Sequence, residues 1–146
     1  MFALSTFSLE VPTTAGTDIV DLTDSVREAV QQTGIADGLL TLFIAGSTAA
    51  LTTIEYEPGV VNDLRHAIER LFPRELAYEH DRRWGDGNGY AHVRAAFLKP
   101  SLTIPLQQGR LQLGTWQQIV LCDFDNRPRR RQIQGQVLGL RPSSSP

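Results

Sequence analysis

The most apolar run of the chain, GLLTLFIAG, spans residues 38–46 and is bounded by a glycine at each end. A run this short, and rich in residues that favour strands, is typical of a strand in the interior of a sheet. It therefore predicts a central strand at this position. The next residues, GST, predict a bend, and residues 49–57 predict a second strand after it.

Short strands are also predicted near both ends of the chain. Residues 2–11 alternate between apolar and polar, but the alternation slips by one residue between Leu4 and Phe7, which we interpret as a bulge. Residues 18–23 predict a short second strand or an extended lead-in. Four more strands, separated by Gly, Asn and Pro turn signals, are predicted at 101–106, 109–114, 116–124 and 130–140.

The longest helix is predicted at residues 59–72, where apolar side chains recur at helical spacing. Pro58 precedes this stripe and Pro73 follows it, which are favourable positions for a helix start and stop. A shorter helix, capped by Thr23 or Ser25, is predicted to stop at Gly34, and Ser25 has capping-box spacing with Glu28.

Residues 89–98 predict a third helix, with Asn88 at its N-cap and Pro100 beyond its end. Their alternating pattern also fits a strand, so both interpretations stay open. Together these elements predict an α+β fold: an antiparallel-rich, sandwich-like β-sheet packed with two or three helices.

Length and composition limit the class of protein. The chain has 146 residues, a net charge of -2 and one cysteine, which predicts a single domain at 1–140 with a flexible tail at 141–146. This net charge does not favour nucleic-acid binding, and only the arginines of residues 127–131 support such a function. No signal-peptide pattern and no membrane-length apolar run are present, so a cytoplasmic protein with no membrane partner is expected.

Residues 78–92, YEHDRRWGDGNGYAH, hold two of the three histidines of the chain. Their Gly, Asp and Asn residues are typical of a turn, and a plain polar loop is one interpretation. The other is a metal site, because two histidines with a carboxylate suit zinc or a similar divalent ion. His80 and His92 would be its ligands, with Asp81 or Asp86 orienting an imidazole. The 11 intervening residues match no closed structural zinc pattern.

Anion binding is the alternative chemistry for the same part of the chain. If Asn88 caps a helix, the free amides of residues 89–91 would form an anion site next to His92 that suits a phosphate. In a regular strand Arg129 and Arg131 point to one face, where they can clamp a phosphate or a carboxylate. The competing interpretation of these arginines is a solvated turn.

Three further polar positions are candidates for a site. Ser47 and Thr48 follow the central strand, where small residues either let a ligand approach the backbone or simply form a tight bend. Glu55 interrupts an apolar strand, either as a general base or metal ligand or on a solvated face. His66 lies opposite the apolar stripe of the longest helix and is predicted to be solvated.

Four segments, at 46–64, 78–98, 101–125 and 128–131, resemble the YjbQ family in order along the chain. This is a group of small, poorly characterised proteins often labelled secondary thiamine-phosphate synthase. The motifs LGTWQQI and YEHD followed by GNG-x-AH carry the resemblance most specifically, and it runs from about residue 40 to 139. Many members of the family have a histidine where this chain has Gly46.

The resemblance implies an α+β fold assembled as a homotrimer, with a cleft near the subunit interface and a divalent metal held through histidine in some members. By position it implies metal binding by His80 and His92, with zinc or magnesium as the ion. Carried over residue by residue, it implies catalytic roles for Glu55, His80 and His92, and substrate or phosphate binding by Ser47, Thr48, Asn88, Arg129, Arg131 and Thr115. It points less directly to Asp63, Asp81 and Trp116.

The function implied by the resemblance is thiamine-phosphate synthase activity, in which a pyrimidine diphosphate is joined to a thiazole phosphate and pyrophosphate is released. Glu55 or His80 would handle protons, while Arg129, Arg131, the loop amides and a divalent ion would stabilise the leaving diphosphate. The alternative is a non-catalytic homotrimer that binds a divalent metal or a small phosphorylated metabolite. Neither function predicts a membrane or nucleic-acid partner.

Overall fold

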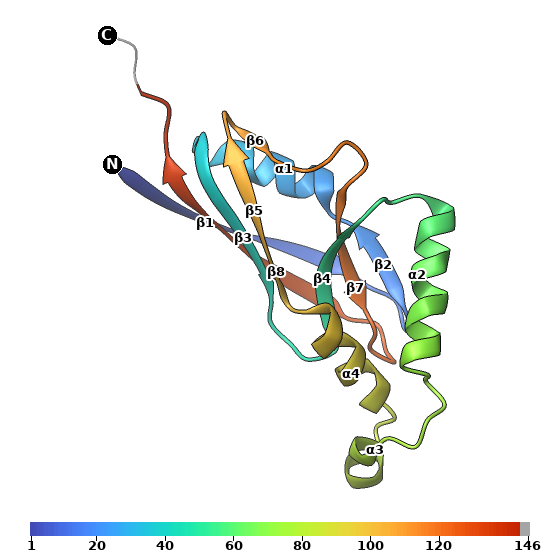
Figure 1. The fold of residues 1–146 in the computed structure, drawn as a ribbon. Helices are drawn as coiled ribbons and strands as arrows, with labels where there is room; N and C mark the ends of the chain where they lie inside the picture. The colour runs from blue at the N-terminus through green and yellow to red at the C-terminus, as the bar shows by residue number, and fades with distance from the viewer. Residues whose placement is uncertain (144–146) are drawn as a thin grey trace.

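The computed structural model describes residues 1–143 of the chain. In chain order, its elements are β1 (Phe2–Pro12), β2 (Asp18–Asp21), α1 (Thr23–Gln32), β3 (Asp37–Ile44), β4 (Ala49–Ile54), α2 (Pro58–Leu71), α3 (Glu79–Trp84), α4 (Gly89–Leu98), β5 (Ser101–Gln107), β6 (Arg110–Leu111), β7 (Gln118–Asp123) and β8 (Arg130–Leu140). The strands form a large sheet in the order β1-β8-β3-β5-β6 and a small sheet in the order β2-β7-β4 (Figure 1). All the pairings are antiparallel.

The main core lies between the two sheets. Leu40, Leu42 and Val137 of the large sheet pack in one cluster with Leu51 and Leu121 of the small sheet, and all five side chains are fully buried. Alternation along each strand sends these apolar side chains to the inner face. The predicted α+β class with antiparallel, sandwich-like sheets is therefore confirmed.

The second face of the small sheet is covered by helices α2 and α4. Ile68 of α2 and Ala95 of α4 pack with Val120 and Cys122 of β7 in a second apolar cluster. Burial raises the pKa of the Cys122 thiol to about 12, so it stays protonated and inert, as expected for a buried cysteine. The small sheet thus separates the two apolar clusters.

Strand β1 contains no bulge, and the predicted slip is wrong. It pairs with β8 in one unbroken register from Phe2↔Leu140 to Pro12↔Arg130, and its burial alternates regularly along its whole length. The pattern misled because β1 has apolar residues on both faces. Phe2 and Leu4 point outward and are 73% and 61% exposed.

Neither Thr23 nor Ser25 caps helix α1, whose N-cap position is Leu22. No side chain of a capping box bonds its first turn; instead Asp21 Oδ1 accepts hydrogen bonds from the Thr23 amide at 3.0 Å and the Thr23 hydroxyl at 2.7 Å. The helix therefore starts at Thr23, before Ser25. The carboxylate of Asp21, at the end of β2, thus satisfies the first amide of the helix.

Two other helices lie where the sequence pattern also allowed a strand or a loop. Residues 89–98 form a helix and not a strand, because Tyr90, Ala91, Arg94 and Ala95 are buried on one helical face. Helix α3 is a fourth helix within residues 1–143, one more than expected, in a segment whose turn residues favoured a loop.

Residues 141–143 follow β8 without regular structure, and residues 144–146 of the predicted tail lie outside the described part of the chain. Over the described residues, no helix is both long and apolar enough to cross a membrane.

Candidate metal centre

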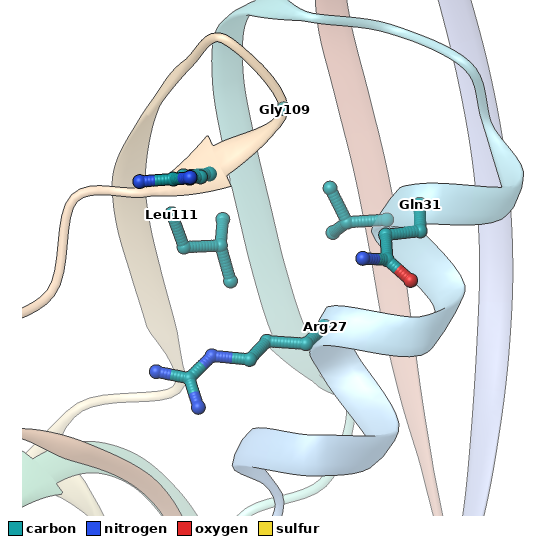
Figure 2. Close-up of a pocket in the computed structure, with 6 residues that line it drawn as sticks. Arg27, Gln31, Gly109 and Leu111 are labelled. Carbon is teal, nitrogen blue, oxygen red and sulfur yellow. The ribbon is translucent and has the colours of Figure 1, made fainter.

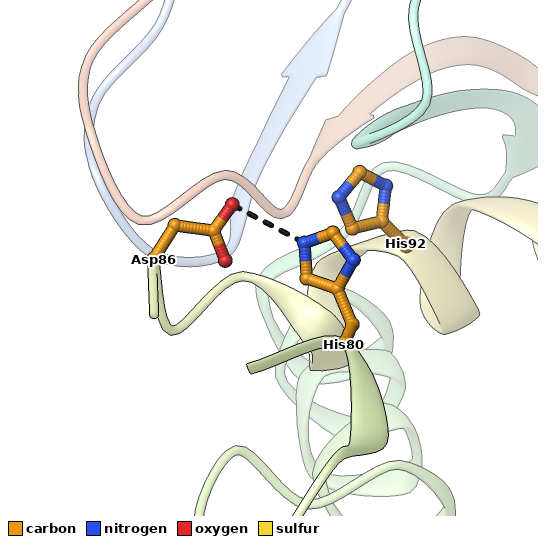
Figure 3. A group of neighbouring side chains, drawn as sticks. All are labelled: His80, Asp86 and His92. Atoms are coloured by element: carbon orange, nitrogen blue, oxygen red, sulfur yellow. Dashed lines mark hydrogen bonds and ion pairs between the residues drawn. The ribbon is translucent and has the colours of Figure 1, made fainter. Parts of the chain in front are cut away.

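Two histidines and an aspartate from the 78–92 segment converge at one end of the molecule. His80 comes from α3, Asp86 from the loop after it and His92 from α4, and one potential ligand atom of each lies within 4.8 Å of the others (Figure 3). The ring centroids of the two histidines are 4.5 Å apart. Helix α3 is what closes the 11-residue gap between them. We call these three residues the triad.

The loop that carries Asp86 is fixed by hydrogen bonds. Helix α3 ends at Gly85, whose φ of 68° is the left-handed conformation that reverses the chain after a helix. Asp86 Oδ1 then accepts from the Asn88 amide at 3.1 Å, and Asn126 donates to the Asp86 carbonyl at 2.7 Å. The Asn88 amide, and next the His80 imidazole, lower the pKa of Asp86 below its ordinary value. Asp86 is therefore a carboxylate at neutral pH.

The orientation of His92 is set by a backbone carbonyl. Its Nδ1 lies 3.1 Å from the Ser47 carbonyl oxygen, which can only accept a hydrogen bond. Nδ1 therefore carries the proton, and Nε2 keeps its lone pair. A histidine that binds a metal typically donates its second ring nitrogen to a carbonyl or a carboxylate in this way.

His80 Nε2 lies 3.2 Å from Asp86 Oδ2. This distance suits a hydrogen bond, and it also matches two ligands of one tetrahedral ion, which lie about 3.3 Å apart when each bond is about 2.0–2.1 Å. The side chains of His80 and Asp86 are 33% and 47% exposed. An ion here would have three protein ligands and a side open to water or substrate, the arrangement of catalytic zinc sites.

A second polar cluster lies beside the triad and is closed. Asp123 and Asp125, at the end of β7, are 0% and 1% exposed. Arg131 donates to both oxygens of Asp123, Nε to Oδ2 at 2.7 Å and Nη2 to Oδ1 at 2.9 Å. Arg129 Nε donates to Asp125 Oδ2 at 3.1 Å. We call these four residues the buried ion cluster.

An anion bound by Arg129 and Arg131, as predicted, would have to compete with ion pairs inside the protein. The two arginines do lie on one face, but each pairs with a buried carboxylate, so the charges of the cluster cancel. The Asp123 hydrogen bonds raise the pKa of Arg131 further. A phosphate would have to displace a bidentate ion pair to reach this guanidinium.

Thr48 is part of this closed network as well. Its hydroxyl donates to Asp125 Oδ2 at 2.9 Å and accepts from Arg131 Nη2 at 2.6 Å. Burial raises the pKa of Asp125, but hydrogen bonds from Thr48, Asn88 and Arg129 outweigh it and hold that pKa below its ordinary value. Thr48 fixes the bend to the cluster, whereas its neighbour Ser47 is exposed and contacts His92 through its carbonyl.

Gly46 begins the bend that joins the two clusters. Its φ of 124° is a conformation that favours glycine, and a Cβ built there would lie 3.3 Å from Arg131 Nη1. The bend 46–48 thus contacts the triad through Ser47 and the buried ion cluster through Thr48. A depression of about 170 Å³, lined mainly by small residues of this bend and of α4, lies next to His92.

The predicted anion site at the start of α4 is already filled by protein atoms. Asp81 Oδ1 accepts from the Gly89 amide at 2.9 Å, which places a negative charge where a phosphate was expected. Asn88 occupies the N-cap position, but its side chain makes no capping bond and accepts from the Asn126 amide at 3.1 Å. Of the two aspartates considered, Asp86 contacts an imidazole and Asp81 caps a helix.

Three predicted residues lie at the opposite end of the small sheet. Glu55 directly follows β4, and Thr115 and Trp116 precede β7; all three are exposed. Strands β4 and β7 pair from Ala49↔Asp123 to Ile54↔Gln118, so about 17 Å separates the two ends at about 3.4 Å per residue. Within one chain, Glu55 and Thr115 are not brought together with His80 and His92.

The remaining candidates lie on α2. Asp63 is exposed there and is not brought to the triad. His66 is exposed on the same helix, as predicted. The residues that sequence reasoning missed are Asp123 and Asp125. Their spacing of two after an apolar strand places both on one face, the same signal that was noticed for the arginines.

Comparison with known proteins identifies relatives over nearly the whole chain. The family model described as "UPF0047 protein YjbQ-like" matches residues 7–140. A UPF0047 protein of Archaeoglobus fulgidus is 37% identical over 125 residues, which cover 86% of this chain and 94% of the relative. The UPF0047 protein YugU of Bacillus subtilis is 33% identical over 133 residues, covering 90% of this chain and 98% of YugU.

Solved structures show the same fold. A hypothetical protein from Aeropyrum pernix K1 matches with a TM-score of 0.87 at 32% identity, covering 93% of this chain and 99% of the other. A YbjQ-like protein of unknown function from Sulfolobus solfataricus P2 matches with a TM-score of 0.85 at 30% identity, covering 94% and 100%.

Proposed function

The chain belongs to the YjbQ-like UPF0047 family, and from that premise we propose that it is a divalent-metal protein acting on a small phosphorylated metabolite. The metal ligands are His80, Asp86 and His92. The observation that carries the proposal is the convergence of three ligand atoms within 4.8 Å, with His92 held by the Ser47 carbonyl in the tautomer a metal needs.

The donor set favours zinc over magnesium. Two imidazole nitrogens and one carboxylate oxygen suit zinc and similar transition ions, whereas magnesium prefers oxygen ligands in an octahedral arrangement. When bound, such an ion supplies a Lewis acid that neutralises charge on a phosphate oxygen. The Ser47 carbonyl then keeps the His92 ring in place, and Asp86 adds the negative charge that a dication requires.

A metal measurement tests this directly. Untagged wild-type protein is loaded with zinc, dialysed and analysed by inductively coupled plasma mass spectrometry beside His80→Ala, His92→Ala and His66→Ala. We expect stoichiometric zinc in the wild type and in His66→Ala, which removes an exposed histidine of α2. Zinc is lost from the other two variants. Equal zinc in all four proteins, or none in the wild type, contradicts the proposal.

The family resemblance adds a narrower candidate, thiamine-phosphate synthase activity. The triad favours it, since a dication is suited to stabilise a leaving diphosphate. His80 serves as a metal ligand in this proposal, so its imidazole is not free to move a proton, and Glu55 lies at the opposite end of the small sheet. The cationic help expected from Arg129 and Arg131 is taken up by Asp123 and Asp125.

Activity and binding are separated by one assay. Zinc-loaded protein is incubated with the pyrimidine diphosphate and the thiazole phosphate, and thiamine phosphate is measured against a protein-free control. Product that disappears in His80→Ala supports the enzyme. Stoichiometric metal without product above the control leaves the non-catalytic binding protein as the function.

We also propose that the protein is a homotrimer, as the resemblance implies. Support comes from the outer face of the large sheet, where Leu138 of β8 lies in register between Leu4 of β1 and Leu39 of β3. These three are 51%, 61% and 48% exposed, and Phe2 and Leu140 extend the patch. Adjacent exposed apolar side chains of this kind are typical of a protein interface. Light scattering tests it: a trimer is expected for the wild type, and a monomer for the wild type contradicts it.

A further inference from the structure

A second cavity lies far from the triad, between α1 and the β5–β6 hairpin. Its volume is about 290 Å³, near the lower limit of small-molecule sites. In Figure 1, α1 and β6 lie at one end of the molecule, and α3 and α4, which carry the two triad histidines, lie at the other. Neither the proposed function nor the predicted site residues involve this cavity.

The hairpin wall of the cavity is held in place by hydrogen bonds. Gln108 and Gly109 form its two-residue turn, with φ of 50° and 76°. The Gln108 amide donates to Asp37 Oδ1 at 3.0 Å, and the Gly109 amide donates to the Ala36 carbonyl at 2.9 Å. The turn is thus fixed to the segment that leads into β3, so the cavity is preformed.

Two arginines and two apolar side chains line this cavity. Arg27 and Gln31 come from α1 and face the hairpin, where Leu111 lies opposite (Figure 2). Val30 of α1 adds to the apolar part of the lining, and Arg110 of β6 supplies the second guanidinium. No acidic side chain lines the cavity within residues 1–143.

Neither arginine has a strong partner in the described part of the chain. Arg27 Nη1 lies 4.0 Å from an oxygen of Asp24, whose side chain is fully exposed, a contact worth little in water. Arg110 makes no ion pair with any described residue. By contrast, Arg129 and Arg131 each pair with a buried aspartate. Among the described residues, Arg27 and Arg110 are therefore free to bind an anion, whereas Arg129 and Arg131 are held by aspartates.

We propose that this cavity binds a small organic phosphate. Arg27 and Arg110 bind the phosphate group, to which guanidinium offers paired N–H donors. The uncharged part of the ligand packs against Val30 and Leu111, and Gln31 supplies a hydrogen bond. The ligand class is a phosphate monoester with a compact apolar group, because a bare anion would leave the apolar wall uncovered.

Calorimetry with phenyl phosphate tests the site on the full chain. The proteins are the wild type, Arg27→Gln, Arg110→Gln and Arg65→Gln, all treated with a chelator. Arg65 is a matched control, since it is exposed on α2 and makes no ion pair with the described residues. We expect saturable binding to the wild type and to Arg65→Gln. Loss of one charged hydrogen-bond donor weakens binding about tenfold in each of the other two.

Three further measurements make the result specific. Inorganic phosphate is expected to bind at least several-fold more weakly than phenyl phosphate. In Leu111→Ala this difference in affinity between the two ligands should be smaller, because part of the apolar wall is removed. His92→Ala is expected to bind phenyl phosphate as the wild type does, and circular dichroism checks that each variant is folded. No binding to the wild type, wild-type affinity in both arginine variants, or loss of binding in His92→Ala overturns the proposal.

Discussion

The triad and the buried ion cluster lie side by side, joined by the bend 46–48, yet they differ in what they leave free. In the buried ion cluster every charged group is paired and the carboxylates are at most 1% exposed, although the Arg129 side chain is 34% exposed. In the triad, His92 keeps a free nitrogen, and Asp86 and His80 face solvent. A polar residue is available to a ligand only where the fold has not already used its hydrogen bonds.

The largest expected difference between the clusters is in stability. Asp123→Ala leaves the Arg131 guanidinium, whose side chain is 11% exposed, without its bidentate partner. We expect a loss of about 3–5 kcal/mol in the free energy of unfolding, measured by urea denaturation with circular dichroism. His80→Ala in chelator should change the same quantity by less than about 0.5 kcal/mol. Similar losses for both variants would abolish the distinction.

Metal should affect only the triad. Zinc at about 100 times its dissociation constant is expected to raise the free energy of unfolding of the wild type by about 2.7 kcal/mol. Scanning calorimetry should show this stabilisation in His66→Ala and not in His92→Ala. A zinc effect that survives His92→Ala would place the ion elsewhere in the protein.

Acid should act more strongly on the buried ion cluster. Hydrogen bonds hold the pKa of Asp125 below its ordinary value of 3.8, so its ionised form stabilises the protein above that pH, and this contribution is lost as pH falls through the lower, folded-state pKa. In Asp125→Asn the free energy of unfolding should therefore fall less steeply with decreasing pH below about pH 4 than it does in the wild type. Asp86→Asn should reduce this slope less, because Asp86 is exposed. Chemical denaturation at several pH values checks this, and a larger effect of Asp86→Asn would reverse the comparison.

The smallest effect is expected at the bend between the clusters. Gly46→Ala should lower the free energy of unfolding by about 1–2 kcal/mol, because φ at this residue is 124° and Arg131 Nη1 must move. Gly16→Ala is the matched control, with φ of 95° and no atom within 4 Å of the added Cβ. If both variants lose the same free energy of unfolding, the backbone conformation alone explains the loss and the contact with Arg131 contributes nothing.

The fold class and the histidine pair could be predicted from sequence because both follow from local patterns. Alternation identified most strands, and the clustering of His80 and His92 in a short polar segment drew attention to the triad. The bulge predicted in β1 is wrong because that strand has apolar residues on both faces. The sequence pattern alone does not show which apolar residue belongs to which face.

The state of the charged residues could not be predicted in the same way. Arg129 and Arg131 look like free cations in sequence, although Asp125 stands only four residues before Arg129 and Asp123 eight residues before Arg131. The turn between β7 and β8, which belong to different sheets, brings these side chains together. Asp81 directly follows His80 along the chain, whereas Asp86 is six residues from each histidine. Helix α3 and the reversal at Gly85 decide between them by turning Asp86 back toward His80.

The pairing of β1 with β8 also has a consequence for how the chain folds. Phe2 pairs with Leu140, and β3 pairs with the other edge of β8, so the two strands β1 and β3 are joined only through the last strand made. Such long separations in sequence slow folding, because the loop must close before the contacts form. During synthesis, β1 therefore remains without its partner until residues 130–140 have left the ribosome.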